Sequence, residues 1–196
     1  MSDKPVYHDA MRVLQDRQGT RRLADRLAEH RRRTAFSDDD RAFIEGRNFF
    51  MLATADADGF PDCSYKGGAP GYARLTGPSS LVFPSLDGNG MYRSLGNIVA
   101  NPQIGMLFID FETPRRLRVN GRAVVSWDDP LIAAYPGAEA VVHVKAEGIF
   151  TNCPRYIHRE GEVSPYLETK DTAPKVPDWK TWPEFRDVLP RKPDPE

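Results

Sequence analysis

The stretch from Leu81 to Ala123 limits the possible folds of this chain more than any other part of it. It opens with a short apolar run, Leu81–Pro84, and continues through a glycine-rich loop into a helical pattern over Met91–Ala100. Asn101-Pro102 would end that helix, because a residue before proline disfavours helical backbone angles. Strand patterns then return. The stretch therefore predicts one short helix inserted between β-strands.

Two strand patterns follow this helix. Ile104–Ile109 is nearly all apolar, which predicts a strand buried on both faces. The residues from Arg116 to Arg122 alternate strictly, which directs Leu117 and Val119 toward the core. The opposite face then carries Arg116, Arg118, Asn120 and Arg122. Such a face is either solvated or lies opposite an anion, and the spacing alone leaves both readings open.

The loop before the helix contains Asp87-Gly88-Asn89-Gly90, and its glycines let a ligand approach the main chain closely. The first turn of the following helix offers unpaired N–H groups and the positive end of the helix dipole, where phosphates bind. Arg93 lies in that turn, and Asn97 lies four residues further along the same face. The pattern favours an anion site at the start of this helix.

Composition excludes several classes of protein. Of the 196 residues, 40% are hydrophobic and 28% charged, and the formal net charge is −1, which is typical of a globular domain rather than a strongly nucleic-acid-binding one. No apolar run approaches the roughly 20 residues that span a bilayer. The first residues have no apolar signal-peptide core, so we expect a cytoplasmic protein. The two cysteines and four histidines are scattered, and we expect no metal.

Residues 1–47 are expected to form a helical extension. A helical pattern over residues 7–33, with a break at Gly19, carries many arginines among acidic residues. Nucleic-acid contact is one reading of these arginines. The mixed charges favour the other reading, a solvated helix face with ion pairs. Ser37, followed by three aspartates, predicts a helix over residues 38–46.

Further strand patterns cover Phe49–Thr54, Pro61–Gly67 and Ala140–Phe150. Lys66 precedes two glycines and is either a surface lysine of a hairpin or a ligand-binding group. Residues 161–196 are rich in proline, so this tail is expected to pack on the body or on a partner subunit without a long helix.

Six strands with one inserted helix predict a mainly β (α+β) fold, a small antiparallel Greek-key barrel over residues 48–160.

Four segments carry a resemblance to a known family: FFMLATADADGFPDCSYKGG, LVFPSLDGNGMYRSLGNIVANPQIGMLFIDF, RRLRVNGRA and EGIFTNCPRYIHR. In their order and spacing they resemble the pyridoxamine 5′-phosphate oxidase-like, FMN-binding split-barrel family. The similarity covers roughly residues 40–160. It is greatest to the branch of probable FMN-dependent enzymes whose substrates are unassigned.

The resemblance implies a six-stranded split barrel and a homodimer with two FMN molecules at the subunit interface. It also implies an FMN-dependent oxidoreductase acting on a small molecule, with a non-catalytic flavin-binding or storage protein as the alternative. Neither nucleic acid nor membrane is expected as a partner. The matching cofactor-binding positions are Ser64, Lys66, Pro84, Ser85, Asn89, Arg93, Asn97, Arg116 and Arg118.

These positions divide into groups. The resemblance assigns Arg93, Asn89 and the helix start to the FMN phosphate, which carries about two negative charges. It places Lys66 and the region of Ser64 along the flavin ring, and it lets Arg116 or Arg118 reach across from the partner subunit. No catalytic side chain follows from it.

The chain departs from true pyridoxamine phosphate oxidases in two places. Asp62 stands where those enzymes have an arginine, and the segment Trp179–Arg186 does not match their C-terminal substrate-binding pattern. A vitamin B6 substrate is therefore not expected, whereas flavin binding is. Asn152, Cys153 and Arg155 resemble a motif of the branch, and a redox role for Cys153 is the weaker reading because lone cysteines are usually inert.

Overall fold

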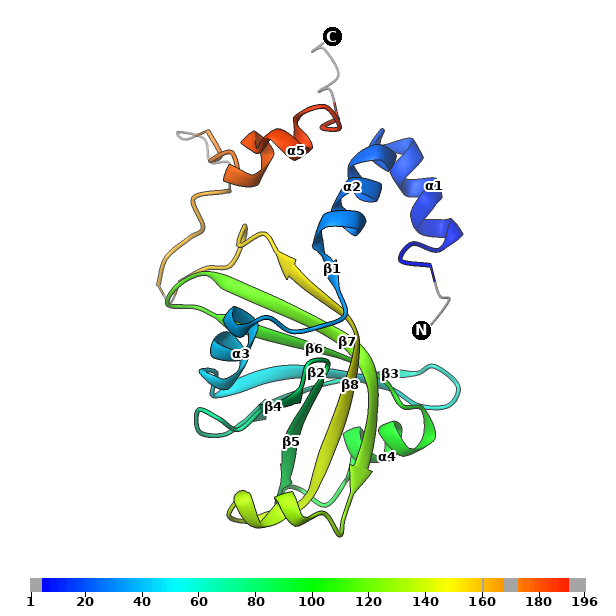
Figure 1. The fold of residues 1–196 in the computed structure, drawn as a ribbon, viewed down its shortest axis with the longest axis vertical. Coiled ribbons are helices and arrows are strands. Elements are labelled where there is room, and N and C mark those ends of the chain that lie inside the picture. The colour runs from blue at the N-terminus through cyan, green and yellow to red at the C-terminus, as the bar shows by residue number, and fades with distance from the viewer. Residues whose placement is uncertain (1–4, 160, 168–172, 191–196) are drawn as a thin grey trace. The chain divides into compact units, whose positions relative to one another are not determined.

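The computed structural model describes residues 5–159, 161–167 and 173–190 of the chain (Figure 1). The chain divides into two compact units. Residues 33–154 form the larger unit, which holds the β-sheet. Residues 1–32 together with 155–196 form the smaller unit, whose described elements are mainly short helices.

Antiparallel strands make up the larger unit. They are β2 (Phe49–Ala55), β3 (Pro61–Gly67), β4 (Arg74–Gly77), β5 (Ser80–Leu86), β6 (Gln103–Asp110), β7 (Arg115–Ser126) and β8 (Ala138–Asn152). They pair in the order β3-β2-β6-β7-β8-β5-β4, and every pairing is antiparallel. The two-residue β1 (Arg32–Arg33), where the chain passes between the units, is the eighth strand of the sheet.

The predicted antiparallel, mainly β fold is confirmed, but the predicted count of six strands is wrong. The two extra strands, β1 and β4, have only two and four residues. Neither contains an apolar run, and a register shift interrupts β4 between Leu75 and Gly77. Strands this short leave no clear periodicity in the sequence.

Helices enter this unit where the sequence predicts them. The helix α3 (Asp38–Glu45) begins with a capping box in which Ser37 and Asp40 each accept a hydrogen bond from the other's backbone N–H. The helix α4 (Arg93–Ala100) lies between β5 and β6 along the chain, and it starts two residues later than predicted. The short 3-10 helix η1 (Pro130–Ala134) precedes β8.

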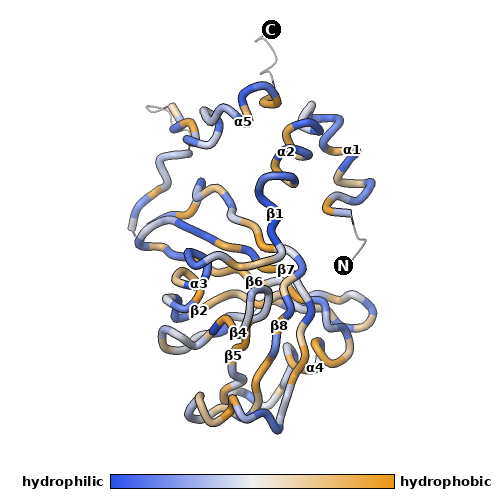
Figure 2. Tube along the Cα trace, viewed as in Figure 1, coloured by the Kyte–Doolittle hydropathy of each residue, from blue (hydrophilic) through white to orange (hydrophobic). Residues whose placement is uncertain are grey.

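The core lies beneath one face of the sheet. Leu52, Phe108 and Leu117 have no exposed surface, and the ring of Phe50 lies 5.0 Å from that of Phe83. Burying each such side chain contributes about 1.5–3 kcal/mol. Figure 2 shows hydrophobic segments along the strands and along α4. The core therefore packs α4 against the sheet.

The other face of strands β3, β2, β6 and β7, called here the outer face, is partly apolar. The prediction that β6 is buried on both faces is wrong, because Leu107 and Ile109 are only half-buried there. Tyr65 and Phe111 are 60% and 47% exposed, and both stack on the ring of Phe49 at centroid distances of 5.2 and 6.0 Å. The outer face thus presents a row of aromatic rings.

In the smaller unit, helices α1 (Asp9–Arg17), α2 (Arg21–Arg31) and α5 (Pro183–Arg186) and the 3-10 helix η2 (Asp178–Thr181) are described. A small core joins the two ends of the chain, since Leu23 of α2 packs with Phe185 and Val188. The break predicted at Gly19 is confirmed: this glycine has φ +62°, a left-handed conformation that glycine adopts readily.

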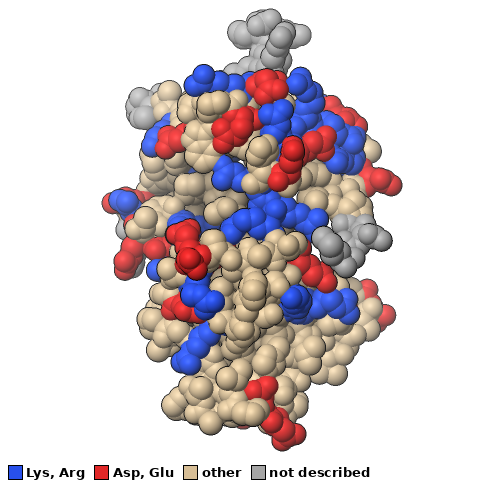
Figure 3. Space-filling view, viewed as in Figure 1, with Lys and Arg blue, Asp and Glu red and all other residues tan. Residues whose placement is uncertain are grey.

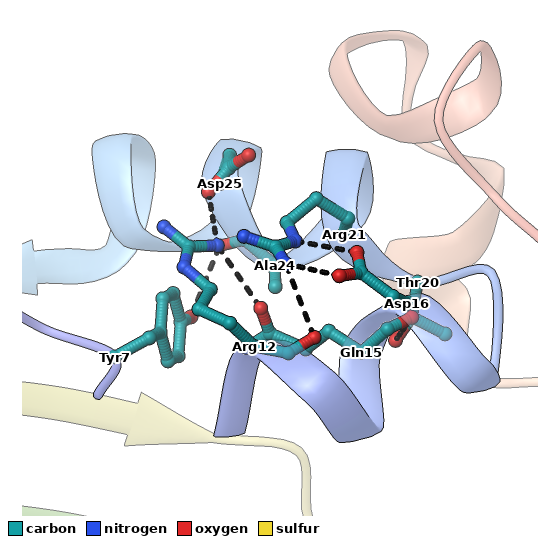
Figure 4. A network of polar contacts seen from close by, with 8 residues as sticks. All are labelled: Tyr7, Arg12, Gln15, Asp16, Thr20, Arg21, Ala24 and Asp25. Atoms are coloured by element: carbon teal, nitrogen blue, oxygen red, sulfur yellow. Dashed lines mark hydrogen bonds and ion pairs between the residues drawn. The ribbon is translucent and has the colours of Figure 1, made fainter. Parts of the chain in front are cut away.

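Four arginines of α1 and α2 pair with acidic residues, and these are Arg12, Arg21, Arg22 and Arg26. Arg12 Nη1 lies 2.6 Å from Asp25 Oδ1, and Arg21 Nε donates to Asp16 Oδ1 at 2.7 Å (Figure 4). Arg26 reaches Asp187 at 3.3 Å. Figure 3 accordingly shows basic and acidic groups side by side over this unit. Within the described parts of the chain, no helix has the length and apolar character needed to cross a membrane.

Candidate functional site

A pocket of about 240 Å³ opens in the larger unit between β3, the end of β5 and the start of α4. Its lining combines polar and apolar groups, and the loop between β5 and α4 forms one wall. The lining residues are Asp62, Ser64, Lys66, Ser85, Leu86, Gly88, Asn89, Gly90, Met91, Tyr92, Arg93, Ser94 and Leu95.

Strand β3 supplies three of these side chains by simple alternation. Asp62, Ser64 and Lys66 share one face of the strand and line the pocket, whereas Cys63 and Tyr65 are exposed on the other. Burial lowers the pKa of the Lys66 ammonium, and the nearby Asp62 carboxylate partly opposes this effect. Among the described residues, no carboxylate lies within ion-pair distance of Lys66. A half-buried cation without such a partner favours an anionic ligand.

The loop before α4 is held by its own hydrogen bond and carries an unusual backbone conformation. Asn89 Oδ1 accepts from the N–H of Met91 at 3.0 Å, and Tyr92 has φ +49°. A non-glycine residue in this left-handed region costs of the order of 1–3 kcal/mol, and such residues are enriched at functional sites. This conformation ends the loop and delays the start of α4 to Arg93.

The start of α4 faces the pocket without a side-chain cap. Tyr92, at the N-cap position, makes no capping hydrogen bond from its side chain, and both Ser94 and Leu95 of the first turn line the pocket. Uncapped N–H groups and the helix dipole together attract an anion. Ser94 is buried, and its hydroxyl lies 2.8 Å from that of Ser64, which joins α4 to β3.

Arg93 brings a second cation to the pocket, but it already has a partner there. Its Nε lies 3.2 Å from Asp62 Oδ1. The Asp62 side chain is the more enclosed of the two, at 18% exposure against 54% for Arg93. Lys66 and Arg93 are thus accompanied by a single carboxylate.

The structure brings together five of the nine residues predicted to bind the cofactor, and these are Ser64, Lys66, Ser85, Asn89 and Arg93. Pro84 is adjacent but buried in β5, where its carbonyl oxygen lies 3.5 Å from the Tyr72 hydroxyl. Asn97 points elsewhere, since its Nδ2 donates to the buried Thr54 Oγ1 at 3.0 Å. It therefore fastens α4 to β2.

Arg116 and Arg118 lie on the outer face of β7 and do not line the pocket. Arg118 is exposed and sits opposite Leu107 of β6. Arg116 has a buried Nε atom with no hydrogen-bond partner within the described parts of the chain. A buried donor without an acceptor is unfavourable, so this arginine has unused hydrogen-bonding capacity.

Ser94 and Tyr92 were not predicted as pocket residues. Ser94 could have been found, because it stands in the first turn of the helix whose start was predicted as an anion site. Tyr92 could not, since its hydroxyl donates to Glu139 Oε2 at 3.0 Å and its ring packs edge-on against Trp127, both far along the chain.

An antiparallel sheet with one inserted helix defines a split-barrel protein, and a pocket lined by Lys66 and Arg93 lies at the start of that helix. The chain belongs to the pyridoxamine 5′-phosphate oxidase family, whose model matches residues 36–153, more than half of its length. The family resemblance is therefore confirmed. A comparison with curated protein sequences gave no match.

Several solved structures are similar to this chain. A pyridoxamine 5′-phosphate oxidase-like protein from Lactobacillus delbrueckii is 24% identical over 61% of this chain and 98% of its own, with a TM-score of 0.49. HupZ of Group A Streptococcus is 22% identical over 59% and 93%, with a TM-score of 0.49. HutZ, described as the heme storage protein of Vibrio cholerae, is 20% identical over 61% and 96%, with a TM-score of 0.44.

Proposed function

We propose that the protein is an FMN-dependent oxidoreductase of the pyridoxamine 5′-phosphate oxidase-like class acting on a small molecule. The observation that carries this proposal is the half-buried ammonium of Lys66 beside the uncapped start of α4. We place the phosphate beside Lys66, which the resemblance assigns to the flavin ring, because it would meet there a cation poorly compensated by the protein and the uncapped N–H groups of α4.

The lining residues have separate roles in this proposal. Lys66 and Arg93 compensate the charge of the phosphate and of the flavin edge, while Ser64, Ser85 and Asn89 offer hydrogen bonds. The bound flavin would supply hydride transfer, and the protein supplies binding, orientation and charge. Asp62 is the one lining group that repels a phosphate. Among the lining residues, this carboxylate is therefore the group that opposes the proposed phosphate.

We also propose a homodimer that forms through the outer face. The exposed rings of Tyr65 and Phe111 would be buried by a second copy, and stacked aromatic rings are typical of the centre of interfaces. Arg116 and Arg118 share this face, and the unpartnered Nε of Arg116 would find an acceptor across it. The resemblance assigns Arg116 or Arg118 to the flavin site of the partner subunit, and this dimer would bring both arginines to the interface.

A second candidate is a flavin-binding protein without turnover. The pocket lining contains neither histidine nor cysteine, so side-chain proton transfer would depend on Asp62, Lys66 or Tyr92. This scarcity of acid–base groups favours binding without catalysis. Reduction of the bound flavin by NAD(P)H, followed at 450 nm under anaerobic conditions, separates the two candidates, because only the oxidoreductase is expected to be reduced at a catalytic rate.

The proposal is tested by comparing FMN with riboflavin, which lacks the phosphate. We expect FMN to bind at least about tenfold tighter, because charge-assisted contacts to the phosphate supply most of the affinity. Flavin fluorescence titration measures both affinities. Equal affinities would contradict a phosphate site at Lys66 and α4. Sedimentation of the purified protein tests the dimer, which a single-chain mass would exclude.

A further inference from the structure

The charge balance of the pocket has a feature that its proposed ligand does not explain. Two cations, Lys66 and Arg93, share the lining with the carboxylate of Asp62, which leaves one net positive charge. Asp62 Oδ1 lies 3.2 Å from Arg93 Nε, and the carboxylate is the more enclosed partner of this pair. The charged side chains of the lining therefore compensate only half of a doubly charged phosphate, in addition to the N–H groups at the start of α4.

Asp62 acts on both cations. The Asp62 carboxylate occupies the Nε side of the Arg93 guanidinium. A phosphate that enters the pocket must therefore share the guanidinium with this carboxylate or displace the carboxylate. Asp62 also partly opposes the lowering of the Lys66 pKa by burial. The carboxylate thus interacts with both cations of the pocket and reduces their attraction for a second negative charge.

We propose that Asp62 sets the charge preference of the pocket, favouring ligand groups with one negative charge over groups with two. The inference rests on the proposed function, because it concerns the phosphate end of the same site. A phosphate monoanion or a phosphodiester balances the single net charge of the lining, whereas a dianion adds repulsion from Asp62. Asp62 is then a specificity-determining residue that also positions Arg93.

FMN itself offers the two charge states for a test, because the second ionisation of its phosphate lies near pH 6. The other titratable and charged groups lining the pocket are Lys66, Arg93 and Tyr92. The hydrogen bond to Glu139 raises the pKa of the Tyr92 phenol, so it stays neutral throughout this range. Between pH 5 and pH 8 the ligand therefore changes from one charge to two.

The experiment measures FMN and riboflavin affinity for the full chain and for Asp62→Asn at both pH values, at constant ionic strength. We expect Asp62→Asn to bind FMN about tenfold tighter at pH 8, with a smaller gain at pH 5 and no gain for riboflavin. The matched control is Glu112→Gln, which removes an exposed carboxylate of the turn between β6 and β7 that does not line the pocket. Its FMN affinity is expected to equal that of the parent chain.

Unchanged FMN affinity in Asp62→Asn at pH 8 would overturn the inference while leaving the proposed function intact, and so would an equal gain at both pH values. Failure of both proteins to bind FMN would overturn the proposed function together with the inference. Asp62→Ser removes the same charge with a smaller side chain. It is expected to reproduce the gain, which keeps the test decisive if the asparagine variant does not fold.

Discussion

The two units of this protein use positive charge in opposite ways. In the smaller unit, α1 and α2 carry many arginines, and those with contacts in Figure 4 are paired with carboxylates at the surface. In the larger unit, the pocket has only two cations, and one of them, Lys66, is half-buried without an ion-pair partner. The number of basic residues in a segment is therefore a poor indicator of an anion-binding site. A cation without an ion-pair partner is a better indicator.

Among the tests of this contrast between unpaired and paired cations, Lys66→Met should have the largest effect, a loss of FMN affinity. Removing the half-buried ammonium should weaken FMN binding by about tenfold to a hundredfold, since a hydrogen bond to a charged group contributes about 1.5–3 kcal/mol. Riboflavin should be affected less. Fluorescence titration of both flavins measures the difference. Equal losses for the two ligands would place Lys66 away from the phosphate.

The same variant should be more stable than the parent chain, which would be unusual for a buried substitution. Burial lowers the pKa of Lys66 in the folded chain below its ordinary value of 10.5. Between the folded-state pKa and the unfolded-state pKa, the unfolded chain therefore binds more protons than the folded chain does. Stability of the parent chain therefore rises with pH through that window, and the advantage of Lys66→Met shrinks. Because Lys66 is only half-buried, the difference at neutral pH should stay below about 1 kcal/mol. Urea unfolding at pH 7 and pH 10 measures it.

Arg93→Ala should have a smaller effect on FMN, about threefold to tenfold, because Asp62 already compensates this guanidinium. The loss should become larger when Asp62 is changed to Asn in the same chain, since the guanidinium is then no longer compensated by the carboxylate and interacts fully with the phosphate. A double-mutant cycle on FMN affinity gives this coupling. A loss as large as that of Lys66→Met would show that Asp62 does not restrain Arg93.

Arg12→Gln in the smaller unit should have the smallest effect. Arg12 is paired with Asp25, whose side chain is 53% exposed, and ion pairs at the surface contribute about 0–1 kcal/mol. Thermal unfolding should shift slightly, and FMN affinity should not change. A marked fall in FMN affinity would break the contrast between the two units, because it would give the paired arginines a role at the pocket.

Local patterns in the sequence predicted much of the pocket. Alternation along β3 placed Ser64 and Lys66 on one face, and the glycine-rich loop followed by a helix placed Asn89 and Arg93 next to an anion site. Each of these predictions depends on neighbours within a few residues along the chain, which a periodic pattern records. The antiparallel mainly β fold was predictable for the same reason.

Contacts between distant residues were not predictable. Asp62 and Arg93 are 31 positions apart along the chain. No local pattern in the sequence indicates that Arg93, predicted to bind the phosphate, pairs with a carboxylate. Asn97 was assigned to the ligand because it shares a helix face with Arg93, but the side chain bonds to Thr54 of β2. The residues of β4 form a strand only because they pair with β5 across a tight turn.

The two polar contacts that fasten α4 to the sheet have a consequence for how a ligand enters. Asn97 bonds to β2 and Ser94 to β3, so the helix is anchored to two neighbouring strands before any ligand arrives. A preorganised helix start needs no rearrangement on association, and little conformational entropy is lost when the anion docks. We therefore expect the ligand to bind without a rearrangement of the backbone. The main movement would be that of Arg93, whose partner changes from Asp62 to the ligand.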